Sequence, residues 1–180
     1  KFVPASGAAS RMFKDMFAFL SADYSEPQSA FERRFFDEIH KFAFFGDLDA
    51  ACVRNCGRGV DALVSAGDYK AVVRNLLAAE GLNYGALPKG LLKFHSYGEC
   101  ARTPLEEHLA EGALYASGAD SDVNLHFTVS PEHRPLFESL ENPDIADQYH
   151  GDVGVDYYGR LVPKHAHGSI ALGGHTSSSK

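Results

Sequence analysis

The first twelve residues constrain the fold more than any other stretch of this 180-residue chain. Two apolar residues, Phe2 and Val3, lead into the small residues 5–10, and Arg11 precedes an apolar pattern of helical spacing that begins at Met12. Strand, small-residue loop and helix in that order present backbone N–H groups and the positive end of a helix dipole to an anion. The stretch is therefore either a phosphate cradle, with Arg11 as a bidentate ligand, or an ordinary strand-to-helix connection.

Length and charge narrow the class of protein. A chain of this size suits one domain, and its formal net charge of −7 argues against a nucleic-acid partner. No apolar run is long enough to span a membrane. We expect a cytoplasmic protein. The chain begins in an expected strand without an initiator Met, which suggests a fragment of a longer protein. The oligomeric state is left open.

Three cysteines could indicate either a metal site or free thiols. Cys52 and Cys56 are four residues apart, a spacing that places two thiols on one helical face, whereas Cys100 stands alone. A zinc site needs two further ligands, and the sequence contains no second Cys pair. We therefore interpret all three as free thiols in a reducing compartment.

Residues 21–85 have a mainly helical pattern. Asp68 is a candidate N-cap for a helix that Gly81 would stop, and a short helix is expected around 60–64. Phenylalanines at helical spacing are expected to be core residues rather than a base-stacking surface. These phenylalanines, counting two in the first helix, are Phe13, Phe17, Phe31, Phe35 and Phe42.

Residues 87–140 alternate extended and helical patterns. Thr103, followed by Pro104 and Glu106, forms a capping box at a helix start. Residues 123–129 alternate apolar and polar, which is typical of a strand, and Ser130 precedes a further helix. This order favours an α/β domain with a mixed sheet covered by helices. We expect one domain over 1–172, with 21–85 as a helical insertion after the first strand–helix unit and 173–180 as a loose tail.

Four stretches in this order resemble the sugar nucleotidyltransferase superfamily, in its UDP-sugar pyrophosphorylase-like branch. They are ASGAASRM at 5–12, PKGLL at 88–92 with TPLEEHL at 103–109, LHFTVSPEH at 125–133, and KHAHGSI at 164–170. The opening and the LPKGLLKFH segment also resemble an uncharacterised bacterial domain-of-unknown-function family. The resemblance covers about residues 1–20 and 85–170.

The resemblance implies a Rossmann-like nucleotidyltransferase fold of the GT-A type. It also implies transfer of a nucleotidyl group from a nucleoside triphosphate to a sugar 1-phosphate, with UTP as the first candidate donor. Arg11 and Lys89 would be the catalytic cations, because phosphoryl transfer depends on neutralising oxygen charge. A magnesium ion would bridge the phosphates, with Asp156 as its candidate ligand. The nucleotide would be bound by Ala5, Ser6, Gly7, Ala8, Ser130, His167 and Gly168.

Two alternatives come from other classes. His165 and His167, two residues apart on one face of a strand, could bind a transition metal in a metal-binding protein or metallohydrolase, with His150, His175, Asp152 and Asp156 close in sequence. Ser6 and Ala9 stand where the superfamily has glycines, and this favours a catalytically inactive nucleotide-binding module.

Overall fold

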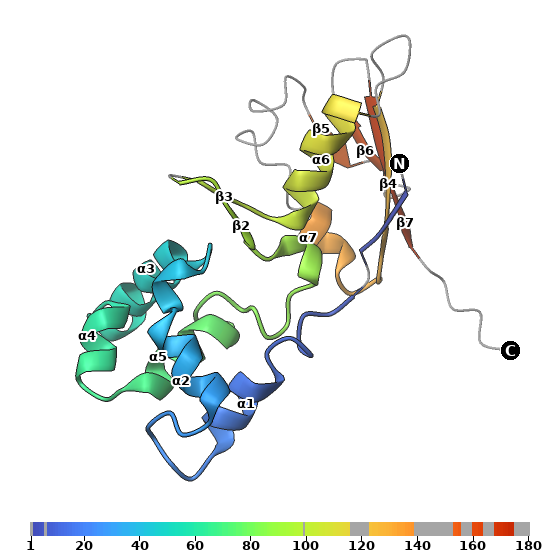
Figure 1. Ribbon diagram of the computed structural model, residues 1–180. Coiled ribbons are helices and arrows are strands. Elements are labelled where there is room, and N and C mark those ends of the chain that lie inside the picture. Colours follow the sequence, from blue (N-terminus) through green and yellow to red (C-terminus); the bar gives the residue numbers. More distant parts are fainter. Residues whose placement is uncertain are drawn as a thin grey trace, which may run out of the picture. The chain divides into compact units, whose positions relative to one another are not determined.

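A computed structural model describes residues 2–5, 7–98, 100–115, 123–138, 153–155, 160–163 and 168–174 (Figure 1). The regular structure in these residues is mostly helical, with seven α-helices. The chain divides into two compact units. The helical unit is residues 8–102, and the sheet unit combines residues 1–7 with 103–180.

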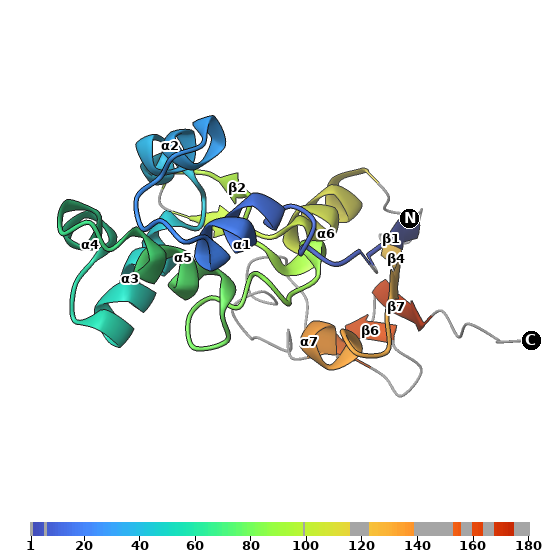
Figure 2. The ribbon, with the colours of Figure 1, turned by 90° about the horizontal axis from the view of Figure 1, so that it is seen from below.

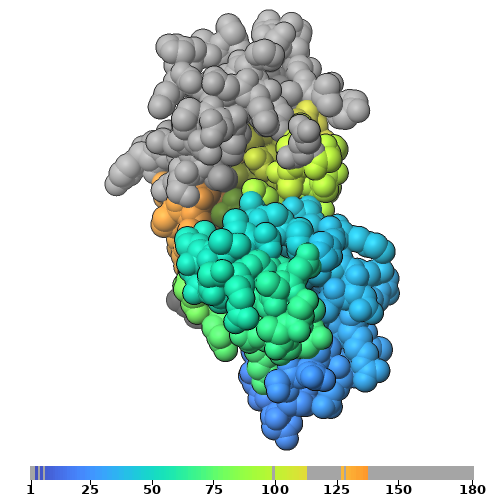
Figure 3. All heavy atoms as spheres, turned by 90° about the vertical axis from the view of Figure 1, so that its left-hand side faces the viewer, coloured from blue at the N-terminus to red at the C-terminus, as the bar shows by residue number. Residues whose placement is uncertain are grey.

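The helical unit is organised around α5 (Tyr69–Leu77), which contacts α1, α3 and α4. The outer surface of α3 and α4 is drawn in teal and green in Figure 3. The remaining elements of the unit are α1 (Lys14–Ser21), α2 (Ala30–Asp37), α3 (Phe45–Cys56), α4 (Val60–Ser65), the 3-10 helices η1 (Ile39–Lys41) and η2 (Lys89–Leu91), and the strand pair β2 (His95–Ser96) and β3 (Ala101–Arg102).

Local capping chemistry explains where the helices begin and end. The Asp68 side chain accepts a 3.4 Å hydrogen bond from the Ala71 amide, which confirms the predicted N-cap of α5. Ser29 and Glu32 form a reciprocal capping box at the start of α2. Gly57 caps the C-terminus of α3, and its φ of 71° is in the left-handed region that glycine adopts without strain.

The core of the helical unit is rich in aromatic rings, but not every phenylalanine that was predicted to be a core residue is buried. Phe13 and Phe35 are buried, as expected, whereas Phe17, Phe31 and Phe42 are 39%, 46% and 36% exposed. The prediction failed for these three because helical spacing does not reveal which face of a helix meets a neighbour. The aromatic residues that fill the core beside Phe13 and Phe35 are Phe19, Phe36, Phe44 and Tyr84.

The sheet unit contains a five-stranded sheet of order β1-β4-β7-β6-β5. β4 is parallel to β1 and β7 on either side of it, whereas β6 is antiparallel to both β7 and β5. The neighbouring strands β1, β4, β7 and β6 are labelled in Figure 2. The elements are β1 (Phe2–Pro4), α6 (Pro104–Tyr115), β4 (Val123–Val129), α7 (Arg134–Glu138), β5 (Val153–Val155), β6 (Arg160–Pro163) and β7 (Gly168–Gly174).

The first helix and strand of this unit follow their sequence signals. Thr103 Oγ1 accepts from the Glu106 amide at 3.2 Å and the Glu106 carboxylate accepts from the Thr103 amide at 2.6 Å, so the predicted capping box is confirmed. Strand β4 covers the predicted residues 123–129. The buried side chains of the unit include Val3, Leu105, Leu109, Phe127, Val129 and Phe137.

The expected Rossmann-like α/β fold is wrong. In that fold a helix follows each parallel strand and packs on the sheet. Here α1–α5 lie in a unit of their own, α6 and α7 are the described helices of the sheet unit, and β5, β6 and β7 are antiparallel neighbours. The physical reason is that the helices between residues 14 and 77 bury their apolar faces against one another, so they need no sheet to cover them.

The predicted insertion and tail are only partly covered by the described residues. Helices α2–α5 lie within 21–85. Of the predicted tail, Gly173 and Gly174 end β7, and residues 175–180 lie outside the described residues. The arrangement as one domain over 1–172 stays a prediction. No helix in the described part of the chain has the length and apolar character needed to cross a bilayer.

Candidate functional site

The opening loop meets the PKGLL segment within the helical unit. The Ala9 amide donates a hydrogen bond of 3.2 Å to the Leu87 carbonyl, and Ala8 and Pro88 form an antiparallel bridge. Two of the stretches singled out in the sequence, far apart along the chain, therefore lie side by side.

Arg11 and Lys89 are the two cations that these stretches carry. Both side chains are exposed, and neither has an ion-pair partner among the described residues. Lys93, four residues after Lys89, is by contrast neutralised by Asp47 at 2.7 Å. Within the described residues both cations are therefore available to an anion, although the formal net charge of the chain is −7.

The loop reaches the first helix through a turn. The Met12 amide donates to the Ala9 carbonyl at 2.8 Å and the Phe13 amide to Ser10 at 3.3 Å, so α1 begins at Lys14, later than the sequence pattern indicated. Ala9 is fully buried in the helical core. Its methyl group points away from solvent and does not narrow the exposed side of the loop.

Ala5, Gly7 and Ser130 belong to the sheet unit. β1 and β4 are parallel, with Pro4 opposite Thr128, so the residues that follow these strands leave the sheet at the same edge. Ala5 is half-buried, Gly7 is exposed, and a Cβ at Gly7 would meet nothing within 4 Å. The structure therefore brings Ala5 and Gly7 to the same edge as Ser130.

Gly168 is at the other edge of that sheet. It is the first residue of β7 and is opposite Val123, the first residue of the parallel strand β4, whereas Ser130 follows the last. Seven strand residues separate the two positions, a distance of about 20 Å. The structure does not bring Gly168 and Ser130 together.

The other predicted site residues cannot be placed. Ser6, Asp156, His165 and His167 lie outside the described residues, as do His150, Asp152 and His175. Within the described ranges, no group of three or more His, Cys, Asp or Glu side chains could hold a metal ion. Cys52, Cys56 and Cys100 are free thiols, and burial raises the pKa of Cys52 to about 11.

His133 is a candidate site residue that the sequence pattern does not mark. Its side chain is only 9% exposed, and its Nδ1 atom has no hydrogen-bond partner among the described residues. Ser130 Oγ, three residues earlier, is also shielded from solvent and unpartnered within those residues. No periodicity or spacing marks His133, because burial without a partner is visible only in three dimensions.

The described residues thus form two units, with Arg11 and Lys89 exposed on the helical unit and with Ser130 Oγ and His133 Nδ1 unpartnered within the described part of the sheet unit. The chain belongs to the family described as a domain of unknown function, DUF4301, whose model matches residues 1–161. The predicted membership of a domain-of-unknown-function family is therefore confirmed. No curated protein and no solved structure matches the chain. Nothing in these comparisons links it to the sugar nucleotidyltransferases, and that resemblance stays a hypothesis.

Proposed function

We propose that this chain binds the phosphate groups of a nucleotide through Arg11 and Lys89 and transfers a nucleotidyl group from a nucleoside triphosphate to a sugar 1-phosphate. The observation that carries the proposal is the hydrogen bond from Ala9 to Leu87, which holds the two cation-bearing segments together. UTP is the first donor to test, because the UDP-sugar pyrophosphorylase-like branch is the one that the motifs resemble.

The proposed reaction depends little on a general base from the protein. An oxygen of the sugar 1-phosphate attacks the α-phosphorus of the triphosphate, the bond from that phosphorus to the bridging oxygen breaks, and pyrophosphate leaves with the electron pair. Charge on the phosphate oxygens is the main obstacle, and fixed cations reduce it. Arg11 offers a planar fork for two oxygens, and Lys89 offers a mobile point charge.

Magnesium would enter with the nucleotide in this proposal, since protein-bound magnesium commonly keeps substrate phosphates as ligands. The described residues do not fit a site built by the protein alone, because they contain no suitable group of ligands. No step of the proposal depends on such a site.

Thermal-shift measurements with UTP and magnesium test the binding part. We expect UTP to raise the melting temperature of the wild-type chain, and Arg11→Ala and Lys89→Ala to reduce that shift. Arg58→Ala is the matched control, because Arg58 is also exposed in the helical unit and has no ion pair there among the described residues. If no nucleotide or nucleotide-sugar stabilises the chain, the proposal fails.

Pyrophosphate release tests the transfer part. UTP with a panel of sugar 1-phosphates should release pyrophosphate, and Arg11→Ala should slow the release more than Arg58→Ala does. Nucleotide binding without pyrophosphate release from any acceptor would contradict transfer and favour the inactive binding module.

A further inference from the structure

The sheet unit contains two polar side chains that the fold itself leaves unsatisfied. His133 Nδ1 and Ser130 Oγ are both shielded from solvent and have no hydrogen-bond partner among the described residues. Their backbones, by contrast, are paired: the His133 amide donates to the Ser130 carbonyl at 3.1 Å, and the Phe137 amide donates to the His133 carbonyl at 3.3 Å. The backbone of the turn is therefore well formed, and the missing partners concern the Ser130 and His133 side chains within the described residues.

An unsatisfied buried polar group is unusual in a native protein. More than nine in ten buried polar groups are paired, because an unpaired group loses its hydrogen bonds to water on folding and gains none in the protein. Two such groups three residues apart indicate that something outside the described fold satisfies them. A buried water could do so, and so could the polar part of a ligand.

The position of the pair favours a ligand. Ser130 and His133 follow β4, and Ala5 and Gly7 follow the parallel neighbour β1 at the same edge of the sheet. The backbone at Gly7 is open, since a Cβ there would meet nothing within 4 Å. A few polar groups at the same edge of a sheet as an open stretch of backbone are a common composition for a small-molecule subsite.

The chemistry of the pair indicates a neutral, hydroxyl-bearing group. A hydroxyl and an imidazole can each take part in hydrogen bonds with the hydroxyl groups of a sugar ring. Neither side chain is a permanent cation like the arginine and lysine side chains that bind phosphates. We propose that Ser130 and His133 bind a sugar ring, either the ribose of a nucleotide or the hexose of a sugar phosphate. The inference rests on the proposed function for the identity of these ligands.

Nitrogen-15 NMR of histidine-labelled chain tests the inference directly. The His133 resonances are assigned with His133→Gln, and the probes are uridine and glucose 1-phosphate. We expect a saturable shift of the His133 Nδ1 resonance with at least one probe. Exposed His95, in the helical unit, should not respond. A response to uridine alone identifies ribose, and a response to glucose 1-phosphate alone identifies the hexose.

A variant separates a binding role from a structural one. His133→Phe keeps a planar ring in the buried position and removes the unsatisfied nitrogen, so the melting temperature should be unchanged or raised. Affinity for the responding probe should fall about three- to ten-fold, which corresponds to the loss of one hydrogen bond. If His133→Phe does not fold, Ser130→Ala supplies the same comparison.

Two results would overturn the inference. One is a His133 resonance that neither probe moves, which would mean that a buried water alone satisfies the pair. The other is a lowered melting temperature of His133→Phe with unchanged affinity for the probe. If UTP raises the melting temperature in a way that depends on Arg11 but neither probe shifts the His133 resonance, the sugar subsite is wrong and the proposed phosphate site stands. If a probe shifts the His133 resonance but Arg11→Ala and Lys89→Ala leave UTP binding unchanged, the proposed phosphate site is wrong and the sugar subsite stands.

Discussion

The Ala9 amide lies 3.2 Å from the Leu87 carbonyl oxygen to which it donates, and this hydrogen bond joins the start of the helical unit to the segment that carries Lys89. The Ala9 methyl group is at the same time fully buried in the helical core. One small residue therefore has two roles: its backbone pairs the segments, and its side chain fits a closely packed interior.

Enlarging Ala9 should destabilise the helical unit. We expect Ala9→Leu to lower the free energy of unfolding by about 1–3 kcal/mol, because extra methyl groups have no space in a packed core. Ala8→Leu is the control: Ala8 is exposed, and its substitution should change stability by less than about 0.5 kcal/mol. Urea unfolding of both variants makes the comparison. Equal stabilities would show that the segment around Ala9 is loosely packed.

Gly81→Ala and Gly46→Ala should change stability in opposite directions. A Cβ at Gly81 would lie 1.9 Å from the Asn75 carbonyl oxygen, a backbone atom that cannot move aside, and the Leu82 amide donates to that oxygen at 2.7 Å. A Cβ at Gly46 would meet nothing within 4 Å, and Gly46 lies inside α3.

We expect Gly81→Ala to lower the melting temperature strongly. Gly46→Ala should stabilise the chain by about 0.5–1 kcal/mol, since alanine favours the helix and restricts the unfolded state. A tolerated Gly81→Ala would contradict the close approach of the two backbone segments.

Glu32 should make the helical unit sensitive to acid. Although burial alone would raise the pKa of its carboxyl, the hydrogen bonds donated by the Ser29 and Gln28 amides and the Tyr24 hydroxyl lower that pKa below its usual value of 4.5. A carboxyl with a lowered folded-state pKa stabilises the fold above its unfolded pKa. That contribution is lost as the pH falls through the folded value.

We therefore expect wild-type stability to fall below about pH 4.5 more steeply than that of Glu32→Gln. At pH 7 the Glu32→Gln variant should be less stable by about 1–3 kcal/mol, because the Ser29 and Gln28 amides and the Tyr24 hydroxyl lose their charged acceptor. Denaturant unfolding at a series of pH values gives both quantities. Parallel pH profiles for the two proteins would contradict the assignment.

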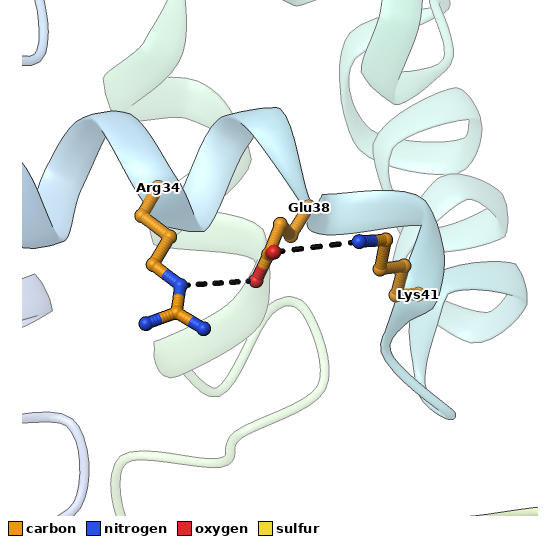
Figure 4. Close-up of polar contacts among 3 residues, drawn as sticks. All are labelled: Arg34, Glu38 and Lys41. Carbon is orange, nitrogen blue, oxygen red and sulfur yellow. Dashed lines mark hydrogen bonds and ion pairs between the residues drawn. The ribbon is translucent and has the colours of Figure 1, made fainter.

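Glu38 is the exposed comparison for Glu32. Its carboxylate lies 3.2 Å from Arg34 Nε and 3.3 Å from Lys41 Nζ, and both cations lower the pKa of Glu38 (Figure 4). All three side chains are solvent-exposed, so water and salt screen the interaction. We expect Glu38→Gln to have a much smaller effect than Glu32→Gln, and added salt to remove it.

The three thiols should react at different rates. Cys56 and Cys100 are exposed, whereas Cys52 is fully buried and its pKa is raised to about 11. Because the thiolate is the reactive form, a thiol reagent at pH 8 should modify two cysteines quickly and the third only after denaturant is added. Peptide mass spectrometry identifies the protected residue. Rapid labelling of Cys52 in the native chain would show that α3 opens readily.

Much of the local structure could be predicted from the sequence. The N-cap at Asp68, the capping box of Thr103 and Glu106, and the strand at 123–129 all follow from residues within a few positions of one another. Ala8 of the opening loop and Pro88 both lie in motifs that are recognisable in the sequence, but only the structure shows that they form a bridge.

The sequence by itself determined where several helices and strands begin, because capping and alternation are short-range interactions. Only the tertiary structure decided that α1–α5 pack into a separate unit, that Ala9 is buried while Phe17 is exposed, and that His133 Nδ1 has no hydrogen-bond partner in the described part of the chain. These properties depend on which faces meet across long stretches of chain. Several such pairings are compatible with the same local pattern, and the packing of the whole chain selects one of them.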